Sequence, residues 1–472
     1  MRALGAQVVD VVATHLATLR DQPVTQALPR REAEARVAMA PPEQGTPFDA
    51  IMDELRAHVI PYHAREPHPG FLGYIPSCPT FPAVLGDWLA TGFNFFAGVW
   101  PVASGPNALE LLVLSWFRDW IGMPPGTSGL LTAGGSQATL TAMLAARHHV
   151  IGDDAARLAG CTVYVSDQGH SSVARAAWIA GVPRANVRAI ATDAALRLDV
   201  AALAAQLRHD REAGLAPMMV VASAGTTNTG AIDPLADVAA LCERESIWLH
   251  VDAAYGGFAM LAPDVRARMA GIERADSVTL DPHKWLFVPF ECGGLLVRDP
   301  DRLTAFFRVT PEYLRDVEAA DRDVNFADYG EQLTRYARAL KVWLSVRYFG
   351  VAAIRAAIEE AMRLARVAES LVRAEPSLEL LSPAQLGIVC FRVREPSLDA
   401  TALDALNEAI NARVNANARV LISSTRLRGR FSLRLCVLGY RTTEAEIALV
   451  IREVLDAYRS SRPGIGISSP RT

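Results

Sequence analysis

One lysine of this chain stands where its amine could take part in chemistry. Lys284 lies in the stretch SVTLDPHKWLFVPF (277–290), between His283 and Trp285, with apolar runs on both sides. Lysine is rarely buried without a partner, because removing the ammonium group from water is costly. Such an amine can attack a carbonyl carbon and hold it covalently. The competing interpretation is an ordinary Asp-Pro turn that carries an exposed lysine.

Other polar residues follow apolar runs elsewhere in the chain. In LLTAGGSQATL (130–140), Gly135 and Ser136 open a helix pattern, and a helix N-terminus that begins with glycine favours an anion such as phosphate. His170 follows the run in VYVSDQGHSS (163–172), Thr226 follows that in VASAGTTNTGAID (221–233), and Asp252 ends that in IWLHVDAAYGG (247–257). Each also has an ordinary interpretation: a helix N-cap, a structural histidine, a turn threonine, or a carboxylate paired with a buried arginine.

The pattern of the surrounding segments predicts how these residues are positioned. Short runs rich in Val, Ile and Leu alternate with helix-length segments such as SQATLTAMLAARHHV (136–150), which is typical of a mostly parallel sheet covered by helices. In such a sheet, ligands bind beyond the carboxyl ends of the strands. The expected strands are GLLTA (129–133), CTVYVSD (161–167), MMVVASAG (218–225), IWLHVDAA (247–254), DSVTL (276–280) and GGLLVR (293–298).

Together, these strand ends carry an anion site, a histidine that could stack on a ring, a carboxylate and an amine. Pyridoxal 5'-phosphate needs this set: a site for its phosphate, an acid that keeps its ring nitrogen protonated, and an amine for a Schiff base. We therefore expect this cofactor and no metal.

Length and composition limit the remaining possibilities. The 472 residues suffice for more than one domain, and 51% hydrophobic and 21% charged residues are ordinary for a globular protein. A formal net charge of -4 gives no basic surface for nucleic acid, and no apolar run has membrane-spanning length. The N-terminus lacks the pattern of a secretory signal, and the six cysteines are scattered without C-x-x-C spacing. A cytoplasmic protein is expected.

We expect four segments along the chain. Residues 1–65 form an N-terminal helical segment too poor in apolar residues to fold alone, and residues 66–348 form the large α/β domain. Residues 349–460 form a small α+β domain that opens with an amphipathic helix and contains the strands GIVCFRV (387–393) and FSLRLCVLG (431–439). Residues 461–472 form a disordered tail.

From Val9 to Ile451, the chain resembles the group II pyridoxal-phosphate-dependent amino-acid decarboxylases of the aromatic-L-amino-acid decarboxylase type. The motifs DPHKW, VDAAYGG and SDQGHSS carry this resemblance, with Lys284 lying 32 residues after Asp252 and Asp252 lying 82 residues after His170. The resemblance implies fold type I of the pyridoxal-phosphate enzymes. It also implies a homodimer with sites at the subunit boundary, in which the N-terminal segment packs on the partner.

The resemblance also implies roles for individual residues and a reaction. The substrate amine would displace Lys284 from an internal aldimine, carbon dioxide would leave to give a quinonoid, and Cα would then be protonated. One departure is that many relatives carry Asn where this chain has Asp281, which makes Asp281 a less certain phosphate ligand. By the resemblance, Lys284 attaches the cofactor, Asp252 pairs with the ring nitrogen, and His170 stacks on the ring and contacts the substrate carboxylate region. Ala254 would lie beneath the ring and Thr226 beside the ring substituents. Phosphate binding is implied for Gly135, Ser136 and His283.

The substrate pocket is implied less directly. In HPGFLGYIPSCPTFP (68–82), Tyr74, Pro76 and Ser77 match the family's pocket stretch, while Ile75 replaces a Phe of animal relatives and Glu66 a Trp. Trp100 in FNFFAGVWP (93–101) is the candidate for a wall contributed across the dimer. The alternative is that these aromatic residues form interface core.

The resemblance implies that a loop residue decides which product forms. Tyr313 lies 29 residues after Lys284 in TPEYLR (310–315), within a charged segment that is expected to close over the site. In the decarboxylase family that the chain resembles, a tyrosine at this position helps to protonate Cα, whereas a phenylalanine favours attack by oxygen and formation of an aldehyde. We expect an amine, with an aldehyde synthase or a decarboxylase for a non-aromatic amino acid as alternatives. An aminotransferase and a binding protein without activity fit the motifs less well.

Overall fold

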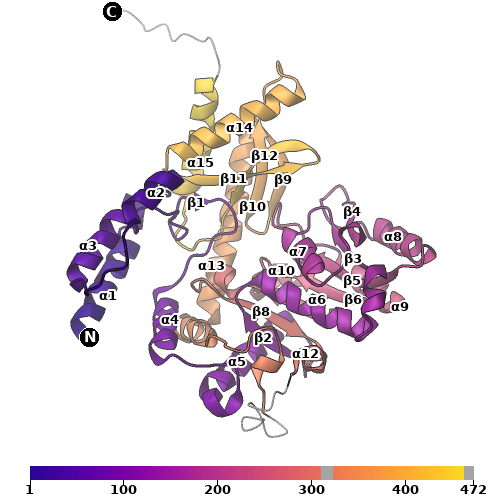
Figure 1. Ribbon diagram of the computed structural model, residues 1–472. Coiled ribbons are helices and arrows are strands. Elements are labelled where there is room, and N and C mark those ends of the chain that lie inside the picture. The colour runs from indigo at the N-terminus through magenta and orange to yellow at the C-terminus, as the bar shows by residue number, and fades with distance from the viewer. Residues whose placement is uncertain (310–322, 462–472) are drawn as a thin grey trace, which may run out of the picture. The chain divides into compact units, whose positions relative to one another are not determined.

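The computed structural model describes residues 1–309 and 323–461, which form two compact units (Figure 1). The large unit comprises residues 77–365 and 384–388, and the small unit comprises residues 1–76, 366–383 and 389–472. The domain boundaries expected after residues 65, 348 and 460 stay predictions. Of the expected tail, residues 462–472 lie outside the described residues.

A seven-stranded sheet forms the centre of the large unit, in the order β2-β8-β7-β6-β5-β3-β4. Strands β7, β6, β5, β3 and β4 pair in parallel, whereas β8 is antiparallel to both of its neighbours, β2 and β7. Because two antiparallel pairings restore the direction, β2 and β7 run the same way and both end at the same edge of the sheet. The strands are β2 (Ser128–Thr132), β3 (Cys161–Ser166), β4 (Val187–Ile190), β5 (Ala216–Ser223), β6 (Trp248–Asp252), β7 (Ser277–Leu280) and β8 (Gly293–Val297).

The six expected strands of this sheet are confirmed. Residues at almost every position of β3, β5 and β6 are buried, as expected when helices cover both faces of a parallel sheet. The sequence prediction missed β4, whose VRAI pattern includes the charged Arg188 and is too short to stand out. Among the described strands, β4 pairs with β3 alone and forms the end of the sheet.

Helices connect and cover these strands. Helix α6 packs on β5, β6, β7 and β8, and Figure 1 shows it lying across the sheet. Helix α13 bends at Gly350, whose φ of 76° lies in the left-handed region that glycine adopts without strain. It begins in the large unit and ends in the small one. The helices are α4 (Phe81–Phe93), α5 (Trp100–Ile121), α6 (Gly135–Ile151), α7 (Ser171–Ile179), α8 (Val200–Glu212), α9 (Leu235–Glu245), α10 (Pro263–Arg268), α11 (Pro282–Trp285), α12 (Asp301–Phe307) and α13 (Ala339–Ala374).

The small unit contains a five-stranded sheet in the order β1-β11-β12-β10-β9. Two of its strands were expected, whereas β1, β9 and β11 were not. The pairing of β1 with β11 and a cluster of Val24, Phe71 and Leu421 join the N-terminal part of the chain to this sheet. The strands are β1 (Phe71–Leu72), β9 (Leu378–Gln385), β10 (Ile388–Val393), β11 (Leu421–Leu427) and β12 (Arg430–Cys436), and the C-terminal helices are α14 (Ala400–Ala416) and α15 (Glu444–Ser461).

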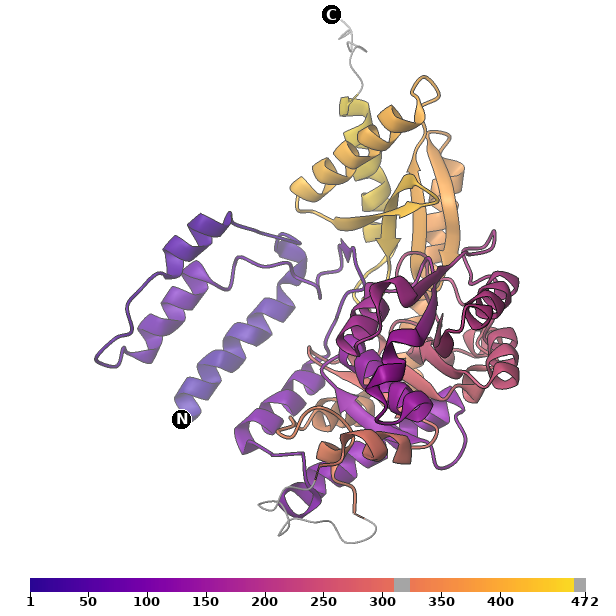
Figure 2. The same ribbon diagram turned by 45° about the vertical axis from the view of Figure 1, so that its right-hand side comes forward.

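Three N-terminal helices also belong to the small unit. Figure 2 shows them lying beside one another and extending away from the five-stranded sheet. A hydrogen bond of 2.8 Å from Gln7 Nε2 to Asp49 Oδ1 links α1 to α3. The helices are α1 (Arg2–Ala17), α2 (Arg30–Val37) and α3 (Phe48–His58). In the described chain, no helix combines the length and the apolar character needed to cross a bilayer.

Candidate active site

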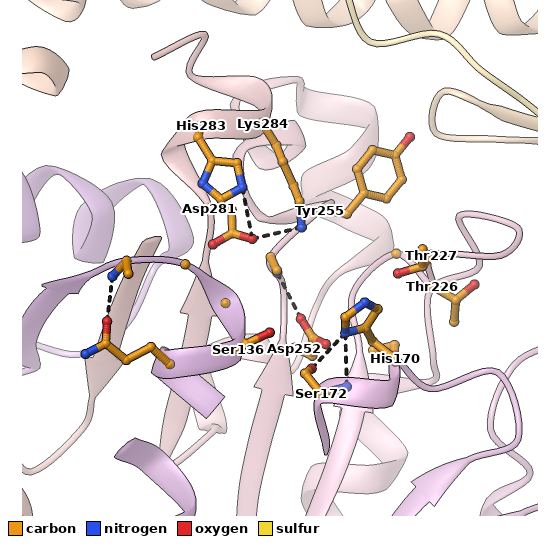
Figure 3. A pocket seen from close by; sticks show the side chains of 17 residues that line it. Ser136, His170, Ser172, Thr226, Thr227, Asp252, Tyr255, Asp281, His283 and Lys284 are labelled. Atoms are coloured by element: carbon orange, nitrogen blue, oxygen red, sulfur yellow. Dashed lines mark hydrogen bonds and ion pairs between the residues drawn. The ribbon is translucent and has the colours of Figure 1, made fainter. Parts of the chain in front are cut away.

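A cavity of about 420 Å³ lies in the large unit at the carboxyl edge of the seven-stranded sheet. Its walls come from the residues that follow β2, β3, β5, β6 and β7, because all five strands end at this edge. Eight residues predicted from the sequence line it together (Figure 3). These are Gly135, Ser136, His170, Thr226, Asp252, Ala254, His283 and Lys284.

The N-terminus of α6 forms one wall of the cavity. The carbonyl oxygen of Gly134 accepts hydrogen bonds from the amides of Gln137 (3.0 Å) and Ala138 (3.1 Å). Gly135 and Ser136 are the first two residues of α6, where backbone amides have no acceptor within the helix itself. Such amides at the positive end of a 17-residue helix suit an anionic group.

Gly135 is also a place of close approach. A Cβ atom added to it would lie 3.1 Å from Ala254 Cβ and 3.1 Å from Asp281 Oδ2. A side chain at this position would therefore fill the space between the start of α6 and the ends of β6 and β7. The small residues leave a cradle that a phosphate group can occupy.

Lys284 projects from the short helix α11 toward this cradle. Its Nζ lies 2.8 Å from Asp281 Oδ2, and its side chain is 19% exposed. His283 Nε2 lies 3.7 Å from the same carboxylate oxygen, while His283 Nδ1 donates a hydrogen bond of 2.6 Å to the carbonyl oxygen of Cys292. Burial lowers the pKa of His283, and the nearby Asp281 offsets this effect only in part. Figure 3 shows both side chains directed at Asp281.

Asp252 ends β6, and its carboxylate faces the cavity. Its Oδ1 accepts a hydrogen bond of 3.1 Å from the amide of Ala254, which fixes the side chain where the strand ends. Two residues earlier, on the same face, His250 is completely enclosed, and burial lowers its pKa to about 4. The ring of His250 bonds to Ser277 Oγ at 2.8 Å and to Thr279 Oγ1 at 3.1 Å. These bonds tie β6 to β7 directly behind Asp252.

His170 occupies the N-cap position of α7. Its Nδ1 accepts a hydrogen bond from the amide of Ser172 at 3.2 Å and lies 2.8 Å from Ser172 Oγ. Because the amide can only donate, the neutral ring carries its proton on Nε2. This capping bond fixes the plane of the ring beside the cavity.

Thr226 is buried, and its hydroxyl closes a turn. Its Oγ1 accepts from the amide of Ala231 at 3.2 Å and lies 3.0 Å from Thr229 Oγ1. The side chain therefore has a structural task as well as a place in the cavity wall.

Other predicted site residues are not among those that line the cavity. Ser77 is buried, with its Oγ donating to the carbonyl oxygen of Val288 at 3.3 Å, and Trp100 begins α5. Tyr74 and Pro76 belong to the small unit, where the carbonyl oxygen of Tyr74 accepts from Arg434 at 2.7 Å. Tyr313 lies outside the described residues.

The cavity also contains residues that were not predicted as site residues. Gln137 Oε1 accepts from the amide of Ala133 at 2.6 Å and so shapes the turn before α6. Ser172 positions His170, and Tyr255 stacks on Trp285 with ring centroids 4.8 Å apart. All three lie within a few residues of an expected strand end, which is the signal that could have identified them. Among the described residues, no cluster of His, Cys, Asp and Glu is arranged to hold a metal ion.

Comparison with known proteins gives consistent matches. Residues 30–394 match the family described as pyridoxal-dependent decarboxylase conserved domain. The chain is 37% identical to an aromatic-L-amino-acid decarboxylase of Bacillus atrophaeus, over 96% of this chain and 94% of the relative. It is 31% identical to a phenylacetaldehyde synthase of Arabidopsis thaliana, over 94% of this chain and 92% of the relative. The crystal structure of Oryza sativa TDC with PLP and tryptamine superposes with a TM-score of 0.93 at 31% identity and covers 97% of each chain.

Proposed function

Because this chain belongs to the pyridoxal-dependent decarboxylase family, we propose that it converts an aromatic L-amino acid into the corresponding amine and carbon dioxide. Membership of the family establishes the coarser activity, which is amino-acid decarboxylation with pyridoxal 5'-phosphate as cofactor. The fold is that of the fold type I enzymes of this cofactor, as the sequence predicted. The observation that carries the proposal is the meeting of Lys284, Asp252, His170 and the α6 N-terminus in one cavity.

When bound, pyridoxal phosphate supplies an aldehyde carbon that links to amines and a cationic ring that accepts the electrons released with carbon dioxide. Lys284 provides the amine that holds the aldehyde carbon. The carboxylate of Asp252 keeps the proton on the ring nitrogen, because a negative charge beside a base favours its protonated form. The amides of Gly135 and Ser136 at the start of α6 would receive the phosphate. His283 can donate to it only with a proton on Nε2, since its Nδ1 proton is already donated to Cys292.

Three predicted residues complete the enclosure of the ring. Ala254 and Thr226 both line the cavity, where Ala254 would be small enough to lie beneath the ring and Thr226 would lie beside the ring substituents. His170 offers a flat ring held in place by Ser172, with its Nε2 proton available to the carboxylate of the substrate. Stacking against an aromatic ring and a fixed donor both favour one orientation of the bound amino acid.

The choice of an aromatic substrate is supported by two relatives, which are named aromatic-L-amino-acid decarboxylase and tryptophan decarboxylase 1. Tyr74, Pro76, Ser77 and Trp100 are proposed to contribute to the pocket for the side chain. The test is to incubate the enzyme with a panel of L-amino acids, aromatic ones and histidine, glutamate and cysteine sulfinate included, and to measure carbon dioxide and amine. Faster turnover of a non-aromatic amino acid would contradict the proposed substrate class.

An aldehyde product is the second candidate, because a phenylacetaldehyde synthase is 31% identical to this chain. We propose the amine instead, since the chain has Tyr313 where the resemblance requires the proton donor. Tyr313→Phe is expected to shift products under air from amine toward aldehyde, ammonia and hydrogen peroxide, while carbon dioxide release continues. The shift is expected because the substitution removes the donor hydroxyl and keeps the electron sink. If the variant gives amine alone at the parent's rate, Tyr313 is not the donor.

A homodimer in the cytoplasm is proposed as the working form of the enzyme. All six cysteines lie within the described residues, where each is buried and forms no disulfide, which fits a reducing compartment. Apolar side chains of α1 and α3, such as Leu4, Val9 and Ile51, are exposed in the single chain. A second copy of the chain that contributes to the subunit boundary would cover them.

A further inference from the structure

Asp281 is buried in the cavity wall and has only one of its two carboxylate oxygens paired. Oδ2 lies 2.8 Å from Lys284 Nζ and 3.7 Å from His283 Nε2. Oδ1 is enclosed and has no hydrogen-bond partner in the described chain. With a side chain only 4% exposed, this carboxylate gains little from water, so its pairing with Lys284 is its main stabilising interaction.

The position of Asp281 as the N-cap residue of α11 does not explain why an aspartate occurs there. Aspartate at an N-cap normally accepts a hydrogen bond from a helix amide, but the side chain of Asp281 makes no such bond. The helix has four residues and turns Lys284 back over Asp281, because the Lys284 amide donates to the Asp281 carbonyl oxygen at 2.9 Å. The backbone turn thus brings the two charged groups together.

A carboxylate at this place also has an electrostatic cost. Oδ2 lies within 3.1 Å of the position that a Cβ of Gly135 would take, next to the proposed phosphate site. Two negative charges so close together repel each other. A buried acid at this place therefore needs a neighbouring positive charge to offset the repulsion, and the ammonium group of Lys284 supplies that charge.

We propose that Asp281 is a positioning residue that serves as the counter-ion of the Lys284 side-chain nitrogen, both as a free ammonium group and when that nitrogen holds the cofactor. The proposal rests on the proposed function, since it takes Lys284 as the attachment point. Among the described acids, Asp281 is the one that forms an ion pair with Lys284. The other titratable groups that face the same cavity are His170, Asp252, Tyr255 and His283. Besides burial, the positive charge of Lys341 in α13 contributes to lowering the pKa of His283.

The consequence is a pH effect that can be seen without turnover. A carboxylate next to the attached nitrogen favours its protonated, positively charged form, so the proton leaves only at higher pH. Proton loss at this nitrogen changes the visible absorption of the cofactor. In Asp281→Asn, which preserves shape and removes the charge, the midpoint of this spectral change is expected to fall by about one to three pH units. The exposed Asp237→Asn removes one charge from the same unit and is expected to leave the midpoint unchanged.

The experiment has two readouts on enzyme loaded with pyridoxal phosphate. Borohydride reduction followed by peptide mass spectrometry reports attachment at Lys284, and absorption spectra across a pH series report the midpoint. Attachment in Asp281→Asn with an unchanged midpoint overturns the counter-ion role and leaves the proposed function intact. Failure of the parent itself to attach the cofactor at Lys284 refutes the proposed function. If Asp281→Asn loses attachment, Asp281→Glu decides: restored attachment supports a role for the charge, and continued loss overturns it.

Discussion

The side chains of Lys284 and of the two residues after it point in different directions and have different roles. Trp285 and Leu286 are fully buried, and Trp285 stacks on Tyr255, so they anchor the segment in the core. Lys284 itself points into the cavity, where Asp281 pairs with its ammonium group. The motif DPHKW therefore holds a reactive amine on a rigid base, which is the arrangement needed to keep a nucleophile in place.

At Asp252, one charge can be removed while the local structure is kept. Asp252→Asn retains an oxygen that can accept the 3.1 Å bond from the Ala254 amide, so the fold should persist. The ring nitrogen of the cofactor would lose the charge that holds its proton. We expect at least about a tenfold loss of cofactor affinity, together with a larger loss of decarboxylation rate. Fluorescence titration with the cofactor and measurement of carbon dioxide release test this, and unchanged values for both would exclude the assigned role.

At the scale of elements, the site depends on how strands and turns meet at one edge of the sheet. Strand β8 begins at Gly293, directly beneath the turn that leads into α6. A Cβ on Gly293 would lie 2.4 Å from Gly134 Cα, which is too close for any side chain. The backbone of β8 thus sets the height of the α6 N-terminus above the sheet.

Gly293→Ala is expected to displace the Gly134 turn and to lower cofactor affinity at least about tenfold, because the phosphate amides would move by several tenths of an ångström or more. Gly160→Ala is the matched control, since a Cβ there meets no atom within 4 Å. Titration of each purified variant with the cofactor gives the two affinities. Equal affinities for both variants would show that this contact does not position the phosphate site.

The stability of the folded state depends on pH through a histidine at the contact between β6 and β7. His250 is buried between them, with a pKa near 4 against a reference value of 6.5. Between these values, the unfolded chain takes up a proton at this histidine and the folded chain does not. The folded state therefore loses about 3 kcal/mol of stability as the pH falls from about 7 to about 4, and the contribution is absent above pH 7.

His250→Gln removes this titration. The variant is expected to be less stable than the parent at pH 8, and the difference in free energy of unfolding should shrink by about 3 kcal/mol toward pH 4. Urea unfolding of both proteins across this range measures the difference. The exposed His209→Gln serves as the control and should show a constant offset. A constant offset for His250→Gln as well would contradict the buried, neutral state of this histidine.

At the scale of the whole molecule, the N-terminal helices contribute little to the core of a single chain. No side chain of α1 or α2 is buried, and Met52 is the one buried residue of α3. The N-terminal part is held instead near residues 19–24 and 69–72, where Val24 donates to the carbonyl oxygen of Ala418 at 2.8 Å and Thr442 donates to that of Pro69 at 2.9 Å. Apolar side chains that are exposed on such helices, as Leu4, Ile51 and Leu55 are, are typical of surfaces that a partner covers.

We expect the protein to sediment as a dimer. Leu55→Glu in α3 is expected to raise the dissociation constant of the dimer at least about tenfold, because a charge would be buried against the partner. Leu398→Glu is the matched control, with a similarly exposed leucine of the small unit outside these helices. Analytical ultracentrifugation over a concentration series measures both. A parent that sediments as a monomer, or equal association of the two variants, would argue against this interface.

The sequence by itself determined six of the seven strands in the large unit's sheet and eight residues of the cavity. Strand patterns and the residues directly after them are local signals, and parallel strands carry their carboxyl ends to a common edge. Lys284, Asp252, His170 and Gly135 could therefore be placed together without knowledge of the packing. The motifs that carry the family resemblance lie on the same strand ends.

Only the tertiary structure decided the features that depend on contacts between distant segments. The antiparallel β8 between β2 and β7 brings the α6 N-terminus to Lys284, and no local pattern specifies that strand order. Strand β11 has the polar sequence LISSTRL and was missed, because its pairing with β1, some 350 residues earlier in the chain, depends on the packing of Val24, Phe71 and Leu421. The direction of the Asp281 carboxylate, toward the side chain of Lys284 and not toward an amide of α11, was likewise fixed by burial and charge in three dimensions.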